Sequence, residues 1–114
     1  MLSLVVIRAK NIDRLATFYT ALGFRFTKHR HGKGPEHWSS TIDKTVFEIY
    51  PSGGNESTVS TRLGFSVASL ADTLEQLRGL NATVLVEPAD TPHGLRAVVQ
   101  DLEGHKVELY QKEG

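Results

Sequence analysis

Residues 46–50 read Val-Phe-Glu-Ile-Tyr, and residues 106–110 read Lys-Val-Glu-Leu-Tyr. In both stretches a central glutamate stands between large apolar residues and is followed two positions later by a tyrosine. Successive side chains of a strand point to opposite faces, so this alternation predicts two strands on which the glutamate and the tyrosine share one face. The glutamates, Glu48 and Glu108, are 108 − 48 = 60 positions apart, which indicates two copies of one structural unit.

The repeat continues upstream of these strands. Ile12 corresponds to Leu70 and Gly23 to Asn81, both at an offset of 58 (70 − 12 and 81 − 23). The apolar residues after Asn11 follow the three- and four-residue spacing of a helix, and Asn11 is expected to cap it. Glycine and asparagine enter the left-handed region at the lowest cost, so both helices are predicted to end in the same kind of cap. A loop that differs by two residues between the copies accounts for the change of offset from 58 to 60.

Each copy is predicted to hold a strand, a helix and three further strands. The first strand is a continuous apolar run, typical of a strand buried on both faces, and the later strands alternate or are rich in β-branched residues. In the first copy these elements are expected at residues 2–7, 11–22, 24–28, 36–42 and 46–50. In the second copy they are expected at residues 63–67, 69–80, 83–86, 95–100 and 106–111, with a proline-containing loop at 87–94.

The predicted fold class is α+β, built from two βαβββ modules that form a curled mixed sheet. The chain is expected to be a single domain, with the first module at residues 1–50, a Ser-, Gly- and Asn-rich linker at 51–60, and the second module at 61–112. Neither module carries a core large enough to stand alone. Each must therefore share a sheet with the other module or with a second chain.

Composition and charge exclude several classes of protein. The chain has 114 residues with 13 basic and 13 acidic side chains, which excludes a strongly basic nucleic-acid-binding protein. It has no cysteine, so disulfides and thiolate chemistry are excluded as well. No stretch approaches the roughly 20 apolar residues that cross a bilayer, and no membrane partner is expected. Residues 2–7 are too few for a signal-peptide core and are followed by Arg8 and Lys10, so we expect a cytoplasmic protein.

Three motifs carry a resemblance to a known family. They are Phe-Tyr at residues 18–19 followed by Leu-Gly-Phe at 22–24, Phe-Glu-Ile-Tyr-Pro at 47–51, and Asp-Leu-Glu-Gly-His-Lys-Val-Glu-Leu at 101–109. Over essentially its whole length, the chain resembles the vicinal oxygen chelate superfamily, which includes glyoxalase I, fosfomycin-resistance enzymes, extradiol dioxygenases and bleomycin-resistance proteins. The last motif is similar to the family's Asp-Pro-x-Gly-x-x-x-Glu ending, with Leu102 in place of proline. The resemblance implies the paired βαβββ fold and a homodimer that completes the site.

In the metal-dependent members of the family, ligands come from the first, fourth, fifth and eighth strands. The resemblance implies that Glu48 and Glu108 hold two of these positions, while Leu4 and Arg62 stand where the family has His, Gln or Glu. A catalytic Zn, Ni, Mn or Fe ion needs about three protein ligands, so no metal cofactor is favoured. The guanidinium of Arg62 is permanently charged and can bridge two carboxylates. We therefore expect a Glu48–Arg62–Glu108 cluster in place of a metal.

The leading interpretation is a metal-free protein that binds a small organic molecule in a cavity near this cluster. The other residues expected to line the cavity are Tyr50, Tyr110, His37 and Trp38. Neighbours on a strand point to opposite faces, so the last two cannot both point inward. The alternative is a lyase, isomerase or dioxygenase for a small vicinal-oxygen substrate, with a divalent metal held by Glu48, Glu108 and a loop histidine. A third interpretation makes the cluster structural, with the protein acting through a partner protein.

Ordinary structural interpretations also stand beside these. A glutamate on the outer face of a sheet is common, although the same residue at both equivalent positions is less so. The other histidines, which are expected to be exposed in loops or turns and fall on no ligand position of the family, are His29, His31, His93 and His105.

Overall fold

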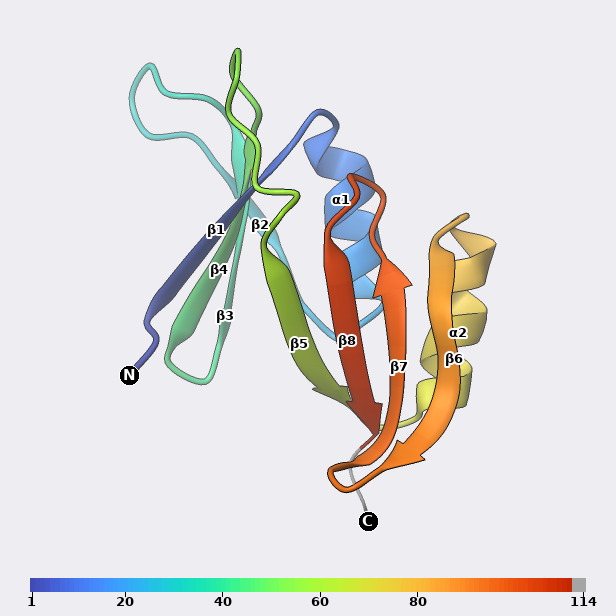
Figure 1. The fold of residues 1–114 in the computed structure, drawn as a ribbon. Helices are drawn as coiled ribbons and strands as arrows, with labels where there is room; N and C mark the ends of the chain where they lie inside the picture. Colours follow the sequence, from blue (N-terminus) through green and yellow to red (C-terminus); the bar gives the residue numbers. More distant parts are fainter. Residues whose placement is uncertain (112–114) are drawn as a thin grey trace. The chain divides into compact units, whose positions relative to one another are not determined.

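The computed structural model describes residues 1–111, whose backbone folds into two compact units (Figure 1). The first unit ends at Thr58 and the second begins at Val59, so the boundary lies inside the linker predicted at residues 51–60. Residue 112, the last of the predicted second module, lies outside the described residues.

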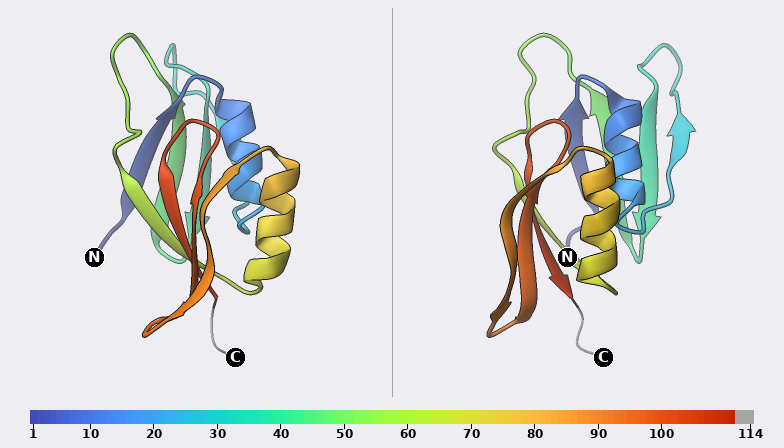
Figure 2. Two further views of the ribbon diagram at one scale, coloured as in Figure 1. Left: turned by 45° about the vertical axis from the view of Figure 1, so that its right-hand side comes forward. Right: turned by 90° about the vertical axis from the view of Figure 1, so that its right-hand side faces the viewer.

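In the first unit a helix packs on a four-stranded mixed sheet. The elements are β1 (Leu4–Ala9), α1 (Ile12–Thr20), β2 (Thr27–His29), β3 (His37–Ile42) and β4 (Thr45–Pro51). The strand order is β1-β4-β3-β2, with β1 parallel to β4 and the other neighbours antiparallel. α1 contacts β1, β3 and β4 and covers one face of this sheet (Figure 2).

The second unit repeats this arrangement. Its elements are β5 (Arg62–Val67), α2 (Leu70–Gly79), β6 (Thr83–Thr91), β7 (Gly94–Gln100) and β8 (Lys106–Gln111). The strand order is β5-β8-β7-β6, with β5 parallel to β8. α2 contacts β6, β7 and β8 and covers one face of the sheet.

These elements confirm the predicted α+β fold of two βαβββ modules. Hydrogen bonding places the described strands in two four-stranded sheets, one in each unit, rather than in one continuous sheet. Among residues 1–111, neither helix combines the length and the apolar character that crossing a bilayer requires.

The ladder register reproduces the repeat residue by residue. Val6 of β1 pairs with Glu48 of β4, and Gly64 of β5 pairs with Glu108 of β8. The corresponding differences, 64 − 6 = 58 and 108 − 48 = 60, are the two offsets found in the sequence. The same pair of parallel strands therefore presents one glutamate in each unit.

The helix caps are those that the sequence predicts. The side chain of Asn11 accepts a hydrogen bond from the backbone N–H of Arg14 at 3.1 Å, as an N-cap does. Gly23 and Asn81, beyond the two helices, have φ angles of 111° and 66°. The fully buried side chains of the two cores include Ile7, Leu15, Phe18, Tyr19 and Ile49 in the first unit, and Leu70, Leu77, Val99, Val107 and Leu109 in the second.

The loop predicted at residues 87–94 is wrong, because β6 continues to Thr91 and passes through Pro88. β6 is the edge strand of its sheet, where a proline need not remove a ladder hydrogen bond. Its register with β7 also shifts twice between Val84 and Ala89, as at a β-bulge. A proline in the sequence usually indicates a loop. Pro88 is compatible with a strand only because β6 lies at the edge of the sheet.

The strand predicted at residues 24–28 is shorter and later, since β2 covers only Thr27–His29. Phe24 is instead a core residue, with its ring centroid 4.9 Å from that of Phe47 and 6.1 Å from that of Tyr19. This aromatic cluster holds the chain between α1 and β2 against the core, where the alternating pattern alone suggested a strand.

Candidate functional site

Glu108 lies on β8, the strand between β5 and β7 in the second sheet. Its ladder neighbours are Gly64 of β5 and Val98 of β7. Arg62 precedes Gly64 by two residues and Arg96 precedes Val98 by two, so both arginines lie on the same face as the Glu108 carboxylate. The backbone therefore brings two guanidinium groups to one carboxylate, one from each side.

Both carboxylate oxygens of Glu108 accept charged hydrogen bonds. Arg96 Nε donates to Oε1 at 2.9 Å and Arg62 Nε donates to Oε2 at 2.5 Å. The hydroxyl of Tyr110 also donates to Oε1, at 3.0 Å. The guanidinium of Arg96, followed by that of Arg62, lowers the pKa of Glu108 to about 2, and the carboxylate raises the pKa of Arg96 in return. Glu108 is therefore an ionised, fully engaged acceptor at neutral pH.

In the first unit the equivalent glutamate, Glu48 on β4, lies beside His37 of β3. His37 Nε2 is 3.6 Å from Glu48 Oε2 and 3.2 Å from the hydroxyl oxygen of Tyr50. The imidazole stacks on the Tyr50 ring, with centroids 4.0 Å apart and planes 10° apart, and its side chain is only 1% exposed. Its Nδ1 is 3.2 Å from the carbonyl oxygen of Pro35. A neutral ring protonated at Nδ1 donates to this carbonyl and accepts the tyrosine hydroxyl at Nε2.

His37 and Arg96 occupy equivalent positions in the two units. Arg96 pairs with Tyr110 across β7 and β8, and His37 stands one residue before the Trp38–Ile49 pair, which is the same place in the first sheet. Each unit thus presents a glutamate, a tyrosine two residues later, and a nitrogen-bearing side chain on the neighbouring strand. Arg96 was not among the predicted site residues. The repeat could have pointed to Arg96. It lies 96 − 37 = 59 positions after His37, between the offset of 58 that relates the two helices and the offset of 60 that relates the two glutamate-bearing strands.

Trp38 lies on the opposite face of β3 from His37. Its indole Nε1 donates to Asp13 Oδ1 of α1 at 2.9 Å, and Lys28 Nζ lies 5.1 Å from the ring centroid. This hydrogen bond, followed by the one from Lys28, lowers the pKa of Asp13. Trp38 also lines a hollow of about 400 Å³ beside α1. The structure therefore separates Trp38 from the polar cluster around His37.

The expectation that His105 is exposed is wrong, since its side chain is fully buried with Nδ1 2.8 Å from Asp101 Oδ2. Asp101 Oδ1 also accepts the backbone N–H groups of Glu103, Gly104 and His105 at 2.9, 3.0 and 3.0 Å. These bonds close the turn between β7 and β8, so this histidine belongs to the scaffold. Three other histidines are exposed as expected, although the first of them ends β2 rather than lying in a loop: His29, His31 and His93.

The donor set around Glu108 does not fit a divalent cation. Both of its oxygens are engaged, and Arg62 and Arg96 place two positive charges where a cation would bind. Among residues 1–111, no three histidine, aspartate or glutamate side chains are grouped as metal ligands. Glu48 and Arg62 belong to different units, and the bridge expected between them stays a prediction.

Comparison with known proteins shows the family. The model of the Glyoxalase/Bleomycin resistance protein/Dioxygenase superfamily matches residues 2–109. No curated protein sequence matches the chain. Similar solved structures are an antibiotic binding protein from Streptomyces sp. CB03234 (TM-score 0.78, 18% identity, covering 99% of this chain and 96% of that one) and a glyoxalase-related enzyme from Fulvimarina pelagi (TM-score 0.77, 19% identity, covering 98% and 88%).

A third is a glyoxalase/bleomycin resistance protein from Albidiferax ferrireducens T118, with a TM-score of 0.76, 16% identity and 99% of each chain covered. At these identities the structural likeness shows the fold alone. The family model spans nearly the whole described chain, including both Glu48 and Glu108. The chain belongs to the glyoxalase/bleomycin resistance protein/dioxygenase superfamily.

Proposed function

We propose that this protein binds a small organic molecule without a metal, on the sheet face of the second unit that carries Glu108. The observation that carries the proposal is the engagement of Glu108 by two guanidinium groups. A carboxylate bonded to two arginines is held in place by charge-assisted hydrogen bonds and needs no cation to be stable. The eighth-strand position, a metal-ligand position in metal-dependent relatives, is thereby turned into part of a polar binding surface.

The groups around Glu108 suit recognition of an organic ligand. Arg62 bonds Glu108 through Nε, and its two terminal nitrogens carry further donors on a side chain that is 47% exposed. The hydroxyl of Tyr110 and the face of its ring add a polar and an apolar surface to the same face. The likeness to an antibiotic binding protein gives a precedent for ligand binding on this fold.

The experiment is a pair of titrations of tag-free protein stripped with a chelator. Calorimetry with Zn²⁺, Ni²⁺, Mn²⁺ and, anaerobically, Fe²⁺ is expected to show no tight stoichiometric binding. A thermal-shift screen against small organic molecules is expected to find compounds that raise the Tm of the same sample. Tight metal binding that either Glu48→Gln or Glu108→Gln abolishes would overturn the proposal.

One observation favours a second candidate, the divalent-metal lyase, isomerase or dioxygenase. Glu48 and His37 place a carboxylate and an imidazole side by side in the first unit, and zinc and iron sites use both ligand types. The same calorimetry decides between the candidates, because this one requires metal binding that is lost in Glu48→Gln and His37→Gln. Activity assays would then follow for that class of enzyme.

The proposal includes a homodimer, as the family resemblance implies. Large apolar side chains of the described residues remain exposed, among them Leu4, Leu85 and Val86 at 51%, 43% and 44%. A second copy of the chain would cover such side chains. Light scattering after gel filtration is expected to give twice the mass of the chain, and a monomer at micromolar concentration would contradict it.

A further inference from the structure

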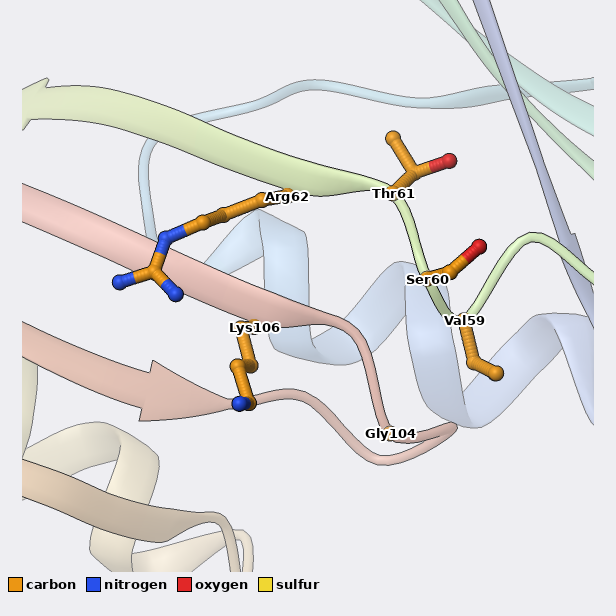
Figure 3. A pocket seen from close by; sticks show the side chains of 6 residues that line it. All are labelled: Val59, Ser60, Thr61, Arg62, Gly104 and Lys106. Carbon is orange, nitrogen blue, oxygen red and sulfur yellow. The ribbon is translucent and has the colours of Figure 1, made fainter.

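Two cationic side chains stand next to each other at the start of the paired strands β5 and β8. Arg62 and Lys106 are directly paired in the parallel ladder, so both side chains leave the sheet on the same face. Together with residues 59–61 and Gly104 they line a pocket of about 240 Å³ (Figure 3). Two of the other lining residues, Ser60 and Thr61, are polar.

The pocket carries positive charge without a neutralising acid in its lining. Its lining holds the guanidinium of Arg62 and the ammonium of Lys106, and no carboxylate. Glu108 shares this face, but its oxygens accept bonds from Arg62 and Arg96. Among the described residues, no carboxylate lies within ion-pair distance of Lys106. Among the described residues, this face therefore has three positive charges, from Arg62, Arg96 and Lys106, against the one negative charge of Glu108.

The first unit shows that the fold does not need these charges. Leu4 and Val46 form the equivalent pair between β1 and β4, at offsets of 62 − 4 = 58 and 106 − 46 = 60. The same structural position is thus apolar in one unit and doubly cationic in the other. The fold at this position therefore does not depend on the two charges. A doubly cationic pair that the fold does not require indicates a role in binding.

We infer that this pocket binds a compact oxyanion, the phosphate or carboxylate group of the ligand, between Arg62 and Lys106. The inference rests on the proposed function, because it names the class of small molecule that the face recognises. Pockets for whole drug-sized ligands measure roughly 300–1,000 Å³, so a volume of about 240 Å³ suits a charged head group. The remainder of such a ligand lies along the face towards Tyr110.

The test uses inorganic phosphate and acetate as probes of the full-length protein, followed by NMR chemical shifts and calorimetry. Both probes are expected to bind saturably and to shift the amides of residues 59–62 and 104–106, and the tighter of the two identifies the head group. Lys106→Gln is expected to weaken binding about tenfold, because it removes a charged hydrogen-bond donor. Lys44→Gln, in the exposed turn between β3 and β4, is the matched control and is expected to leave the affinity unchanged.

Lys106→Gln removes one of two neighbouring like charges, so it is expected to fold as stably as the wild type. Measurement of its Tm checks this. Equal affinity in Lys106→Gln and wild type, or no saturable binding of either probe, overturns the inference. If the screen finds only neutral or cationic molecules, the inference fails and the proposed function stands. If phosphate binds through Lys106 while no organic molecule of any charge binds, the proposed function fails and the oxyanion pocket stands.

Discussion

Replacement of Glu108 by glutamine removes the carboxylate that joins Arg62 to Arg96 while keeping the shape of the side chain. The arginines lower the pKa of Glu108 from 4.5 to about 2, a difference of about 2.5. At 1.36 kcal/mol for each pKa unit, the ionised carboxylate stabilises the folded state by at most about 3 kcal/mol. Arg62 is 47% exposed, and screening by solvent reduces this to about 1–2 kcal/mol.

The pH dependence follows from the direction of this shift. Because the folded-state pKa is lowered, the stabilisation is complete above the unfolded value near 4.5 and is lost as the pH falls towards 2. The wild type is therefore expected to exceed Glu108→Gln in unfolding free energy by about 1–2 kcal/mol at pH 7, with a difference that shrinks between pH 4.5 and pH 2. Urea denaturation followed by circular dichroism at several pH values measures this difference.

The matched control is Glu87→Gln, which breaks an ion pair with Arg78 at 2.8 Å whose glutamate side chain is 69% exposed. Exposed pairs of this kind contribute about 0.2–1 kcal/mol, so a small and nearly pH-independent effect is expected. The reasoning is refuted if Glu108→Gln differs from wild type by the same amount at pH 7 and at pH 2.5. It is also refuted if the two glutamine variants behave alike.

Substitutions at two further positions, Asp101 and Trp38, test the scaffold around the site. Asp101→Ala removes the carboxylate that accepts three backbone N–H groups and contacts buried His105. It is expected to lower the unfolding free energy by about 3 kcal/mol or more, and Asp101→Asn is expected to have a smaller effect. Equal stability of Asp101→Ala and wild type in urea would contradict this. Trp38→Phe removes the hydrogen bond to Asp13 and is expected to raise the pKa of that carboxyl in an NMR titration without changing ligand affinity. A Trp38→Phe variant that loses ligand binding would return Trp38 to the site.

Local sequence patterns determined the modules of this protein. Three patterns involve only a few neighbouring positions: the spacing of apolar residues, the residues that permit a left-handed cap, and the Glu-x-Tyr alternation. They can therefore be recognised in the sequence without knowledge of the fold. For the same reason the repeat correctly placed Glu48 and Glu108 on equivalent strands and put Tyr50 and Tyr110 on the glutamate faces. The shared face of each pair follows from strand geometry alone.

Only the tertiary structure decided what surrounds each glutamate. Arg96 reaches Glu108 because β7 lies beside β8. Trp38 points away from Glu48 and towards α1, where its indole N–H donates to Asp13. Pro88 lies inside a strand because β6 is an edge strand of its sheet. The sequence predicts His105 as an exposed turn residue, but its side chain is buried and pairs with the carboxylate of Asp101. These contacts depend on which strands are neighbours and which positions are at an edge, and such information lies in long-range pairing rather than in local periodicity.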